Sequence, residues 1–195
     1  NRGSNEGVGY FEVNQKSGWR WNTAKAFLRP TCYGRPNFEM WTSAQVSKLL
    51  MKTLSNGQQR CTGVEVWNGR EMVTANATQS VVLTAGAIGS PQLLQLSGIG
   101  AGKDLKQVGV DITHDLPGVG ANLQDHLQIR TVYRVENCKT VNTLYKNWLT
   151  RIGMGLEYVF KRTGPLTMPP STLGAFTKSD PSQTSANIEW HVQPL

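Results

Sequence analysis

The sequence predicts an α/β protein with a second, antiparallel sheet in its last third, and three observations carry this prediction. Residues 81–100 (VVLTAGAIGSPQLLQLSGIG) have the pattern of a buried strand, a glycine turn and a helix. Asn68 and Gly69 stand between two alternating runs, which is typical of a β-hairpin. From residue 127 onward, short alternating runs indicate antiparallel strands around one longer helix. The fold class is therefore α/β, followed by the start of an α+β domain.

The strand, turn and helix at 81–100 each have a local cause. Residues 81–83 (VVL) form a short β-branched run that is typical of a strand buried on both faces of a parallel sheet. Ser90 and Pro91 predict a helix start, because the hydroxyl can cap a free N–H and proline at the first helical position loses no needed donor. Gly98 predicts the helix end. The leucines expected on the inner face are Leu93, Leu94 and Leu96.

The turn between this strand and helix is the candidate ligand site. Ala85 and Gly86 replace bulk with small side chains, so a large group can approach the backbone there. A helix N-terminus presents free N–H groups and a positive dipole end, which favour an anionic or electron-rich ligand such as a cofactor phosphate or flavin. The alternative interpretation is an ordinary tight turn of an α/β protein.

The elements before residue 81 follow from turn and breaker residues. Residues 1–18 predict an extended connection, and residues 24–28 predict a short helix, capped by Asn22 or Thr23, that Pro30 ends. Residues 38–51 have the pattern of two short strands broken near Ser43. Residues 63–67 and 70–74 form the predicted hairpin, with a type I′ turn at Asn68 and Gly69.

The elements after residue 100 are less regular. Residues 103–108 predict a short helix that ends at Gly109, and residues 110–113 predict a strand. Residues 127–135 alternate as a strand does. Residues 144–160 have helical spacing, interrupted by two glycines, with an apolar side made by Leu149, Ile152, Leu156, Val159 and Phe160. Residues 174–178 and 188–192 predict two strands of a second sheet.

Composition and charge exclude several classes of function. The net charge of +7 comes from scattered Lys and Arg with no basic run, so a nucleic-acid partner is not expected. Cys32, Cys61 and Cys138 lie far apart and have no metal-ligand spacing, which favours free thiols in a reducing compartment. No metal site is expected. The three histidines, His114, His126 and His191, lack a partnered nucleophile, so loop or strand roles are favoured over a catalytic base.

Gly118 and Gly120 begin a pattern that is similar to a dinucleotide-binding fingerprint. Leu123 occupies the last glycine position, however, and a loop with a proline precedes the pattern in place of a strand. The chain has no other G-x-G-x-x-G. An NAD-linked dehydrogenase is therefore disfavoured.

The sequence of residues 81–100 resembles a family signature. The matching residues are Gly86-Ala87, Ser90-Pro91, Leu93-Leu94 and Ser97-Gly98-Ile99-Gly100, and they resemble the second signature of the glucose-methanol-choline (GMC) flavoprotein oxidoreductases. The resemblance extends to GVGYFEVNQKSGWRWNTAKAFLRP upstream and LPGVGANLQDHL downstream. Within the family, the sequence of these segments is most similar to that of choline and alcohol dehydrogenases. The resemblance implies FAD as cofactor and oxidation of a primary alcohol to an aldehyde by hydride transfer to the flavin.

The resemblance also implies site residues. It places Val46 against the adenine of FAD, Ala85 and Gly86 beside the cofactor, and the loop of Asn122 and Asp125 near the flavin. For Val46 the alternative is an ordinary strand residue, and for Asn122 and Asp125 it is satisfying loop backbone groups. No catalytic residue is assigned in this chain, because the family's base histidine matches a segment beyond its C-terminal end.

The resemblance divides the chain into two parts. Residues 1–126 correspond to part of an FAD-binding Rossmann-like domain that lacks the glycine fingerprint, and residues 127–195 to the start of a substrate domain. The chain is thus expected to be a middle piece of a longer enzyme, inactive alone and prone to self-association through uncovered edges. The expected partner is a small alcohol, and the expected location is the cytoplasm or the periphery of the inner membrane. The alternative function is a non-catalytic α/β binding or interaction module.

Overall fold

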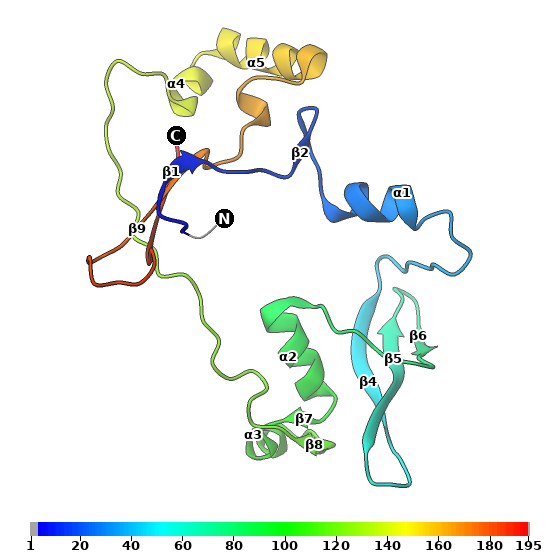
Figure 1. Ribbon diagram of the computed structural model, residues 1–195. Coiled ribbons are helices and arrows are strands. Elements are labelled where there is room, and N and C mark those ends of the chain that lie inside the picture. The colour runs from blue at the N-terminus through cyan, green and yellow to red at the C-terminus, as the bar shows by residue number, and fades with distance from the viewer. Residues whose placement is uncertain (1–3, 195) are drawn as a thin grey trace. The chain divides into compact units, whose positions relative to one another are not determined.

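The computed structural model describes residues 4–194 and divides the chain into two compact units (Figure 1). Unit 1 comprises Asn1–Phe38 and Thr131–Leu195, and unit 2 comprises Glu39–Arg130. The sequence placed residues 1–38 in the same domain as the residues that follow them. In the structure the compact unit formed by this segment also contains the C-terminal segment, and the division into cofactor and substrate domains stays a prediction. The mixture of helices and sheets agrees with the predicted α/β class.

Unit 2 is built on a three-stranded antiparallel sheet in the order β4-β5-β6. Its strands are β4 (Gln45–Thr53), β5 (Gln59–Trp67) and β6 (Met72–Asn76). The prediction of two strands in 38–51 was wrong, because only the second forms. Ser43, where a break was expected, has a φ of 54°, and this left-handed backbone separates β4 from the irregular residues before it.

The turn between β5 and β6 keeps the predicted place but not the predicted type. Gly69 has a φ of 94°, whereas Asn68 is not among the residues with positive φ, so the two-residue type I′ turn does not form. The loop is four residues long and closes through the Asn68 N–H, which donates to the Glu71 carbonyl at 3.2 Å. The Asn68 side chain accepts from the backbone N–H groups of Arg70 at 2.9 Å and Glu71 at 3.0 Å. This asparagine acts through its side chain, which the turn prediction did not consider.

The central helix of unit 2 is α2 (Gly86–Leu96), which starts earlier than predicted. Pro91 lies inside the helix, so neither it nor Ser90 marks the start. The predicted strand at 81–83 is also wrong: the described residues contribute no neighbouring strand there, and Val82 is 79% exposed. A strand exists only through hydrogen bonds to a neighbour, and local β propensity does not replace them.

Three short elements follow α2 and complete unit 2. They are β7 (Ile99–Gly100), α3 (Gly102–Gln107) and β8 (His114–Asp115), and β7 pairs with β8 in parallel. The strand predicted at 110–113 therefore begins at His114 instead, because the partner residues Ile99 and Gly100 pair with His114 and Asp115. Buried apolar side chains from the sheet, α2, β7 and α3 form the core: Leu49, Val66, Leu93, Ile99 and Leu105. Among the three leucines predicted for the inner face, the prediction for Leu96 was wrong, since its side chain is 51% exposed.

Unit 1 contains a second antiparallel sheet in the order β1-β9-β10, as the last third of the sequence predicted for its two later strands. The strands are β1 (Gly7–Tyr10), β9 (Leu173–Thr177) and β10 (Ile188–Val192). The first strand was expected to be only an extended connection. It forms because β9 presents an unpaired edge to it, a partner more than 160 residues away that local pattern cannot reveal.

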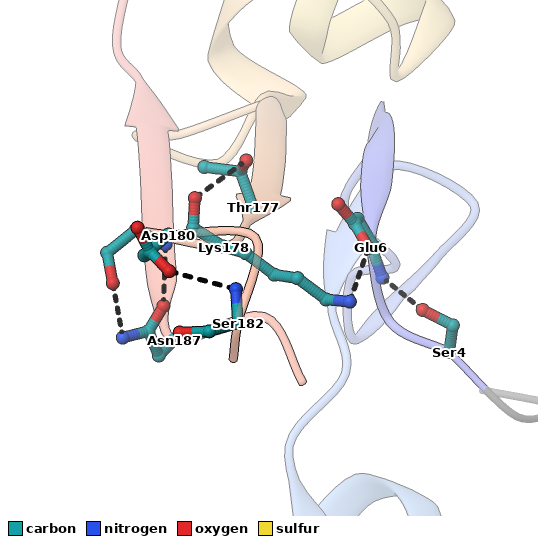
Figure 2. A network of polar contacts seen from close by, with 8 residues as sticks. Ser4, Glu6, Thr177, Lys178, Asp180, Ser182 and Asn187 are labelled. Atoms are coloured by element: carbon teal, nitrogen blue, oxygen red, sulfur yellow. Dashed lines mark hydrogen bonds and ion pairs between the residues drawn. The ribbon is translucent and has the colours of Figure 1, made fainter. Parts of the chain in front are cut away.

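A polar network surrounds the turn between β9 and β10 (Figure 2). Asp180 Oδ1 accepts from the Ser182 N–H at 2.9 Å, and Asn187 bonds Ser179 through both its amide oxygen and its amide nitrogen. Lys178 Nζ lies 3.8 Å from a carboxylate oxygen of Glu6, just before β1. These contacts tie the turn together and connect it to the chain entering β1.

The remaining N-terminal elements of unit 1 are a small hairpin and a helical segment. The hairpin pairs β2 (Gln15–Lys16) with β3 (Trp19–Arg20) across Ser17 and Gly18, which both have positive φ. The π-helix η1 (Ala24–Leu28) continues directly into α1 (Arg29–Thr31). Pro30 does not end the helix as predicted, because it lies near the start of the α1 turn, where its missing N–H costs little. Asn22 is the side chain that caps, through its Oδ1 and the Lys25 N–H at 3.0 Å.

The predicted helix at 144–160 forms as two helices, α4 (Val141–Lys146) and α5 (Trp148–Lys161), followed by η2 (Pro165–Thr167). The two glycines, Gly153 and Gly155, do not interrupt α5. The strand expected at 127–135 is absent from the described part of the chain, and its apolar side chains are exposed. Alternation predicted a strand there, but no neighbour pairs with it.

Candidate functional site

The amino-terminal end of α2 has the open backbone that a cofactor site requires. Ala85 is the N-cap, no side chain caps the first turn, and that turn contains no acidic residue. Gly86 has a φ of 81°, and a Cβ built on it would meet nothing within 4 Å. An 11-residue helix thus offers unpaired N–H groups and its positive dipole end to an exposed space. This arrangement fits the phosphate or ring of a flavin cofactor.

Val46 lies near the start of β4, opposite Val66 of β5. The register shifts between Val46 and Lys48, so Ser47 bulges out of the ladder. The Val46 carbonyl accepts from the Gln45 side-chain amide at 3.3 Å. Val46 is therefore a half-buried residue at an irregular strand end.

Asn122 lies in the exposed loop after β8 and has a φ of 56°. Within residues 4–194 its side chain makes no hydrogen bond, so the alternative that it satisfies loop backbone groups is not met here. Asp125 does follow that alternative, because its Oδ1 accepts from the His126 N–H at 2.8 Å. The two loop residues thus differ: the Asp125 side chain bonds the neighbouring backbone, whereas the Asn122 side chain does not.

Helix α2 is the common neighbour of the segments that carry the predicted site residues. Ser97, 1% exposed at the helix end, accepts from the Leu49 N–H of β4 at 2.8 Å and donates to the Leu93 carbonyl at 2.6 Å. Gln95 donates from its side-chain amide to the Val119 carbonyl at 3.3 Å, in the loop that leads to Asn122. The structure therefore joins β4, α2 and this loop within unit 2, although it shows no direct contact among Val46, Gly86 and Asn122.

Sequence reasoning did not assign roles to the residues that make these connections. Ser97 belongs to the Ser-Gly-Ile-Gly end of the family signature, but its position gave no sign of a bond to a strand 48 residues earlier. Asp115 was also missed, although its carboxylate accepts from the Gly102 N–H at 2.8 Å and so caps α3. A polar residue at the end of a short strand is a weak signal, because turns use the same residue types.

The histidines lie in separate elements, and one of them pairs with a carboxylate. His114 lies in β8, His126 in an exposed loop, and His191 in β10, where its Nε2 is 3.0 Å from Glu189 Oε1. Among residues 4–194 no group of histidine, cysteine and acidic side chains could hold a metal ion. The three cysteines are free. Over the same described range, no helix is long and apolar enough to cross a bilayer.

A separate open hollow of about 610 Å³ lies in unit 1. It is lined by Trp19, Trp21, Lys25, Arg29 and Pro30. The ammonium group of Lys25 lies 5.2 Å from the ring centre of Trp19 and 6.0 Å from that of Trp21, so the hollow is aromatic and basic. None of the predicted site residues belongs to it.

The uncapped α2 turn is joined to the β4 sheet and to the parallel β7-β8 pair, and such an open helix N-terminus is of the class of sites that bind anionic groups. The sequence profile of the GMC oxidoreductases matches residues 1–128. The chain belongs to the GMC oxidoreductase family. The resemblance stated from the signature residues is thereby confirmed, and FAD is confirmed as the cofactor at the level of the family.

Curated relatives agree with this assignment. The chain is 39% identical over 192 residues to alcohol dehydrogenase (acceptor) of Pseudomonas putida, covering 97% of this chain and 34% of the relative. It is 37% identical over 191 residues to the mitochondrial choline dehydrogenase of Homo sapiens, covering 97% of this chain and 31% of the relative. The chain therefore spans about a third of the length of the curated relatives that it matches.

Solved structures share the fold. An FAD-dependent oxidoreductase from Chaetomium thermophilum aligns with a TM-score of 0.74 and 26% identity, over 90% of this chain and 31% of that chain. A fungal aryl-alcohol oxidase aligns with a TM-score of 0.69 and 26% identity, over 89% of this chain and 30% of that chain. In both alignments most of this chain matches a minor part of the solved structure.

Proposed function

We propose that this chain is part of a longer FAD-dependent enzyme that oxidises a primary, choline-like alcohol to an aldehyde. The observation that carries the proposal is the start of α2, with its uncapped first turn, its left-handed Gly86 and open space beside it. Family membership supplies the reaction class. Relatives named for choline and alcohol support the substrate class, which is a small molecule.

The uncovered surface supports the idea of a longer protein. The chain exposes 16009 Å². Two separate compact units, each half its mass, would expose about 11,000 Å² in total by the usual scaling of surface with mass. The excess includes the unpaired segment at 81–83 and the alternating segment at 127–135. We propose that further strands cover both, with residues 1–126 contributing to the cofactor domain and 127–195 to the substrate domain.

When bound, FAD would supply the hydride acceptor, and the residues of this chain would bind and orient it. The α2 N–H groups stabilise negative charge on the cofactor, and Ala85 and Gly86 let it approach the backbone. Val46 and Asn122 are proposed as further cofactor contacts. The base that removes the alcohol proton is proposed to lie outside this chain, because His191, the histidine that pairs with a carboxylate (Glu189, at 3.0 Å), belongs to unit 1, whereas the α2 turn belongs to unit 2.

The proposal is tested in the full-length protein by comparing Gly86→Val with Gly57→Val. The two glycines have the same φ of 81°, and a Cβ at either would meet nothing within 4 Å, so the backbone strain is matched. If the cofactor approaches Gly86, only Gly86→Val loses bound flavin, measured as flavin absorbance per protein. Equal flavin content in the two variants would contradict the site.

Activity of the wild-type full-length protein tests the reaction. It is expected to be yellow and to reduce an acceptor dye when given choline or a simple primary alcohol. A colourless protein that added FAD does not change would instead support the alternative of a non-catalytic binding or interaction module. Oxidation that depends on added nicotinamide cofactor would support an NAD-linked dehydrogenase.

A further inference from the structure

The sequence contains two Asn-Gly dipeptides, Asn56-Gly57 and Asn68-Gly69, and both lie in exposed turns of unit 2. The first connects β4 to β5 and the second connects β5 to β6, so they stand at opposite ends of one strand. Glycine has no Cβ, which leaves its backbone nitrogen open to the preceding side chain. The two glycines have similar φ angles of 81° and 94°. Exposure and backbone angle therefore do not distinguish the two asparagines, whereas their hydrogen bonds do.

The side-chain carbonyl of Asn68 is held by two backbone donors. Its Oδ1 accepts from the N–H groups of Arg70 at 2.9 Å and Glu71 at 3.0 Å. Two donors on one carbonyl oxygen stabilise the negative charge that develops there when a nucleophile attacks the carbon, as the donors of an oxyanion hole do. The Asn68 Cγ is therefore an activated electrophile.

The backbone nitrogen that follows each asparagine is the nearest nucleophile. Within residues 4–194 the Gly69 N–H donates to no other group, whereas the Gly57 N–H donates to the Leu54 carbonyl at 2.9 Å. An attack by the Gly57 nitrogen must first break that bond, which costs about twofold to tenfold in rate. The nucleophile is thus free after Asn68 and restrained after Asn56.

The side-chain amide of Asn56 is also restrained. Its Oδ1 accepts from one donor, the Gln58 N–H at 3.0 Å, and its Nδ2 donates to Gln58 Oε1 at 2.9 Å. The Asn68 Nδ2, by contrast, donates to no group in the part of the chain that the structure describes. The nitrogen that would leave is therefore held at Asn56 and released at Asn68.

We propose that Asn68 is a site of spontaneous deamidation and that Asn56 is protected from it. The Gly69 nitrogen attacks the Asn68 Cγ, the new C–N bond closes a five-membered succinimide ring, and the Cγ–Nδ2 bond breaks. The proton lost by the Gly69 nitrogen leaves with the amide as ammonia. Water then opens the ring. The inference goes beyond the proposed function, because it depends on neither the cofactor nor the alcohol, and the reaction needs no partner but water.

The ring can open at either of its carbonyls, with different results for the hairpin. Opening at Cγ gives aspartate, whose carboxylate can accept from the same two N–H groups of Arg70 and Glu71. Opening at the main-chain carbonyl gives isoaspartate, which adds the Cβ to the backbone between β5 and β6. The folded turn therefore favours aspartate, and each conversion adds one negative charge to unit 2.

Peptide mapping of the full-length protein tests the proposal. The protein is incubated at mildly alkaline pH, folded or in urea, and trypsin then separates residues 53–60 from residues 61–70 by cutting after Lys52, Arg60 and Arg70. Mass spectrometry measures the gain in mass that marks conversion of an amide into an acid. Asn68 is expected to convert at least about tenfold faster than Asn56 in the folded protein. In urea the two asparagines are expected to convert alike.

Two outcomes of this comparison overturn the proposal. Equal or slower conversion of Asn68 in the folded protein means that its turn does not activate it, whether through its own geometry or through cover by the rest of the longer protein. The same preference for Asn68 in urea assigns the difference to the flanking sequence and not to the hydrogen bonds.

A matched pair of variants tests the restraint on Asn56. Gln58→Ala removes the acceptor that holds the Asn56 amide and is expected to speed conversion of Asn56 about twofold to tenfold, while Asn68 is unchanged. Gln59→Ala, whose side chain instead bonds Thr53 Oγ1 at 2.9 Å, is the control and should change neither rate. Fragment spectra locate the converted residue within 53–60. Equal Asn56 rates in the two variants contradict the proposed protection.

Discussion

At the scale of single residues, Ser97 joins more elements of unit 2 by hydrogen bonds than its place in the signature motif indicates. Its hydroxyl accepts from β4 and donates within α2, and its own carbonyl accepts from Thr113 Oγ1 at 3.0 Å. One buried serine therefore connects a strand, a helix and the segment before β8. Gly98, directly after it, has a φ of 80° and no room for a Cβ, because the Asp111 carbonyl lies there.

Replacing Ser97 by alanine should destabilise unit 2. The Leu49 N–H would be left buried without an acceptor, which costs about 1–3 kcal/mol. Urea denaturation, followed by the fluorescence of the tryptophans, measures the change in the free energy of unfolding. Ser80→Ala, at an exposed position, is the control and should stay within about 0.5 kcal/mol of wild type. A similar effect of both substitutions would mean that the Ser97 hydroxyl does not stabilise the fold.

At the scale of elements, the turn between β9 and β10 should respond to acid. The Ser182 hydroxyl and then its backbone N–H donate to the Asp180 carboxylate and lower its pKa from the ordinary value of 3.8. The ionised form is favoured in the folded turn. Its stabilisation is therefore present above the ordinary pKa and is lost as the pH falls through the folded pKa.

Titration by nuclear magnetic resonance checks this turn. The Asp180 midpoint should lie below 3.8 in the wild type, and Ser182→Ala should raise it toward that value by removing the hydroxyl donor. Ser171→Ala, whose hydroxyl instead donates to the Val192 carbonyl at 3.2 Å, should leave the midpoint where it is. A midpoint at or above 3.8 in the wild type would show that the hydrogen bonds do not favour the charged form.

Elements with a local cause were predictable from the sequence. The hairpin at Asn68 and Gly69, the end of α2 at Gly98 and the pair β9 and β10 were confirmed, because turn residues and alternation are local. Strands that depend on distant partners were not. Residues 81–83 and 127–135 have strand patterns without a neighbour, and β1 has a neighbour without a strong pattern.

The candidate site was predictable only in part. The α2 turn followed from small residues before a helix, although the first helical residue was placed at Pro91, five residues after the observed start at Gly86. The roles of Val46 and Asn122 stay predictions, since they came from the family resemblance and no cofactor contact tests them. The bonds of Ser97 and Gln95 could not be foreseen, because they join residues 48 and 24 positions apart.

At the scale of the whole molecule, we expect the 195-residue chain alone to hold no stoichiometric FAD and to show no turnover. The sequence contains no glycine fingerprint, the base is proposed to lie outside it, and losing a general base alone costs about 10²–10⁴-fold in rate. Purified chain is incubated with FAD, choline or a primary alcohol, and an acceptor dye. Dye reduction that depends on flavin and exceeds the blank would show that the essential site lies within these residues.

The pairing of β1 with β9 sets an order of events during synthesis. Val8 faces Ala175, so β1 leaves the ribosome with its partner strand still untranslated. At about 5–20 residues per second, the wait is about 10–30 s. Unit 2 is one continuous segment, Glu39–Arg130, and all of it emerges within this interval. In the nascent chain, unit 2 can therefore fold before unit 1. The exposed β1 edge needs protection until the C-terminal segment has been synthesised.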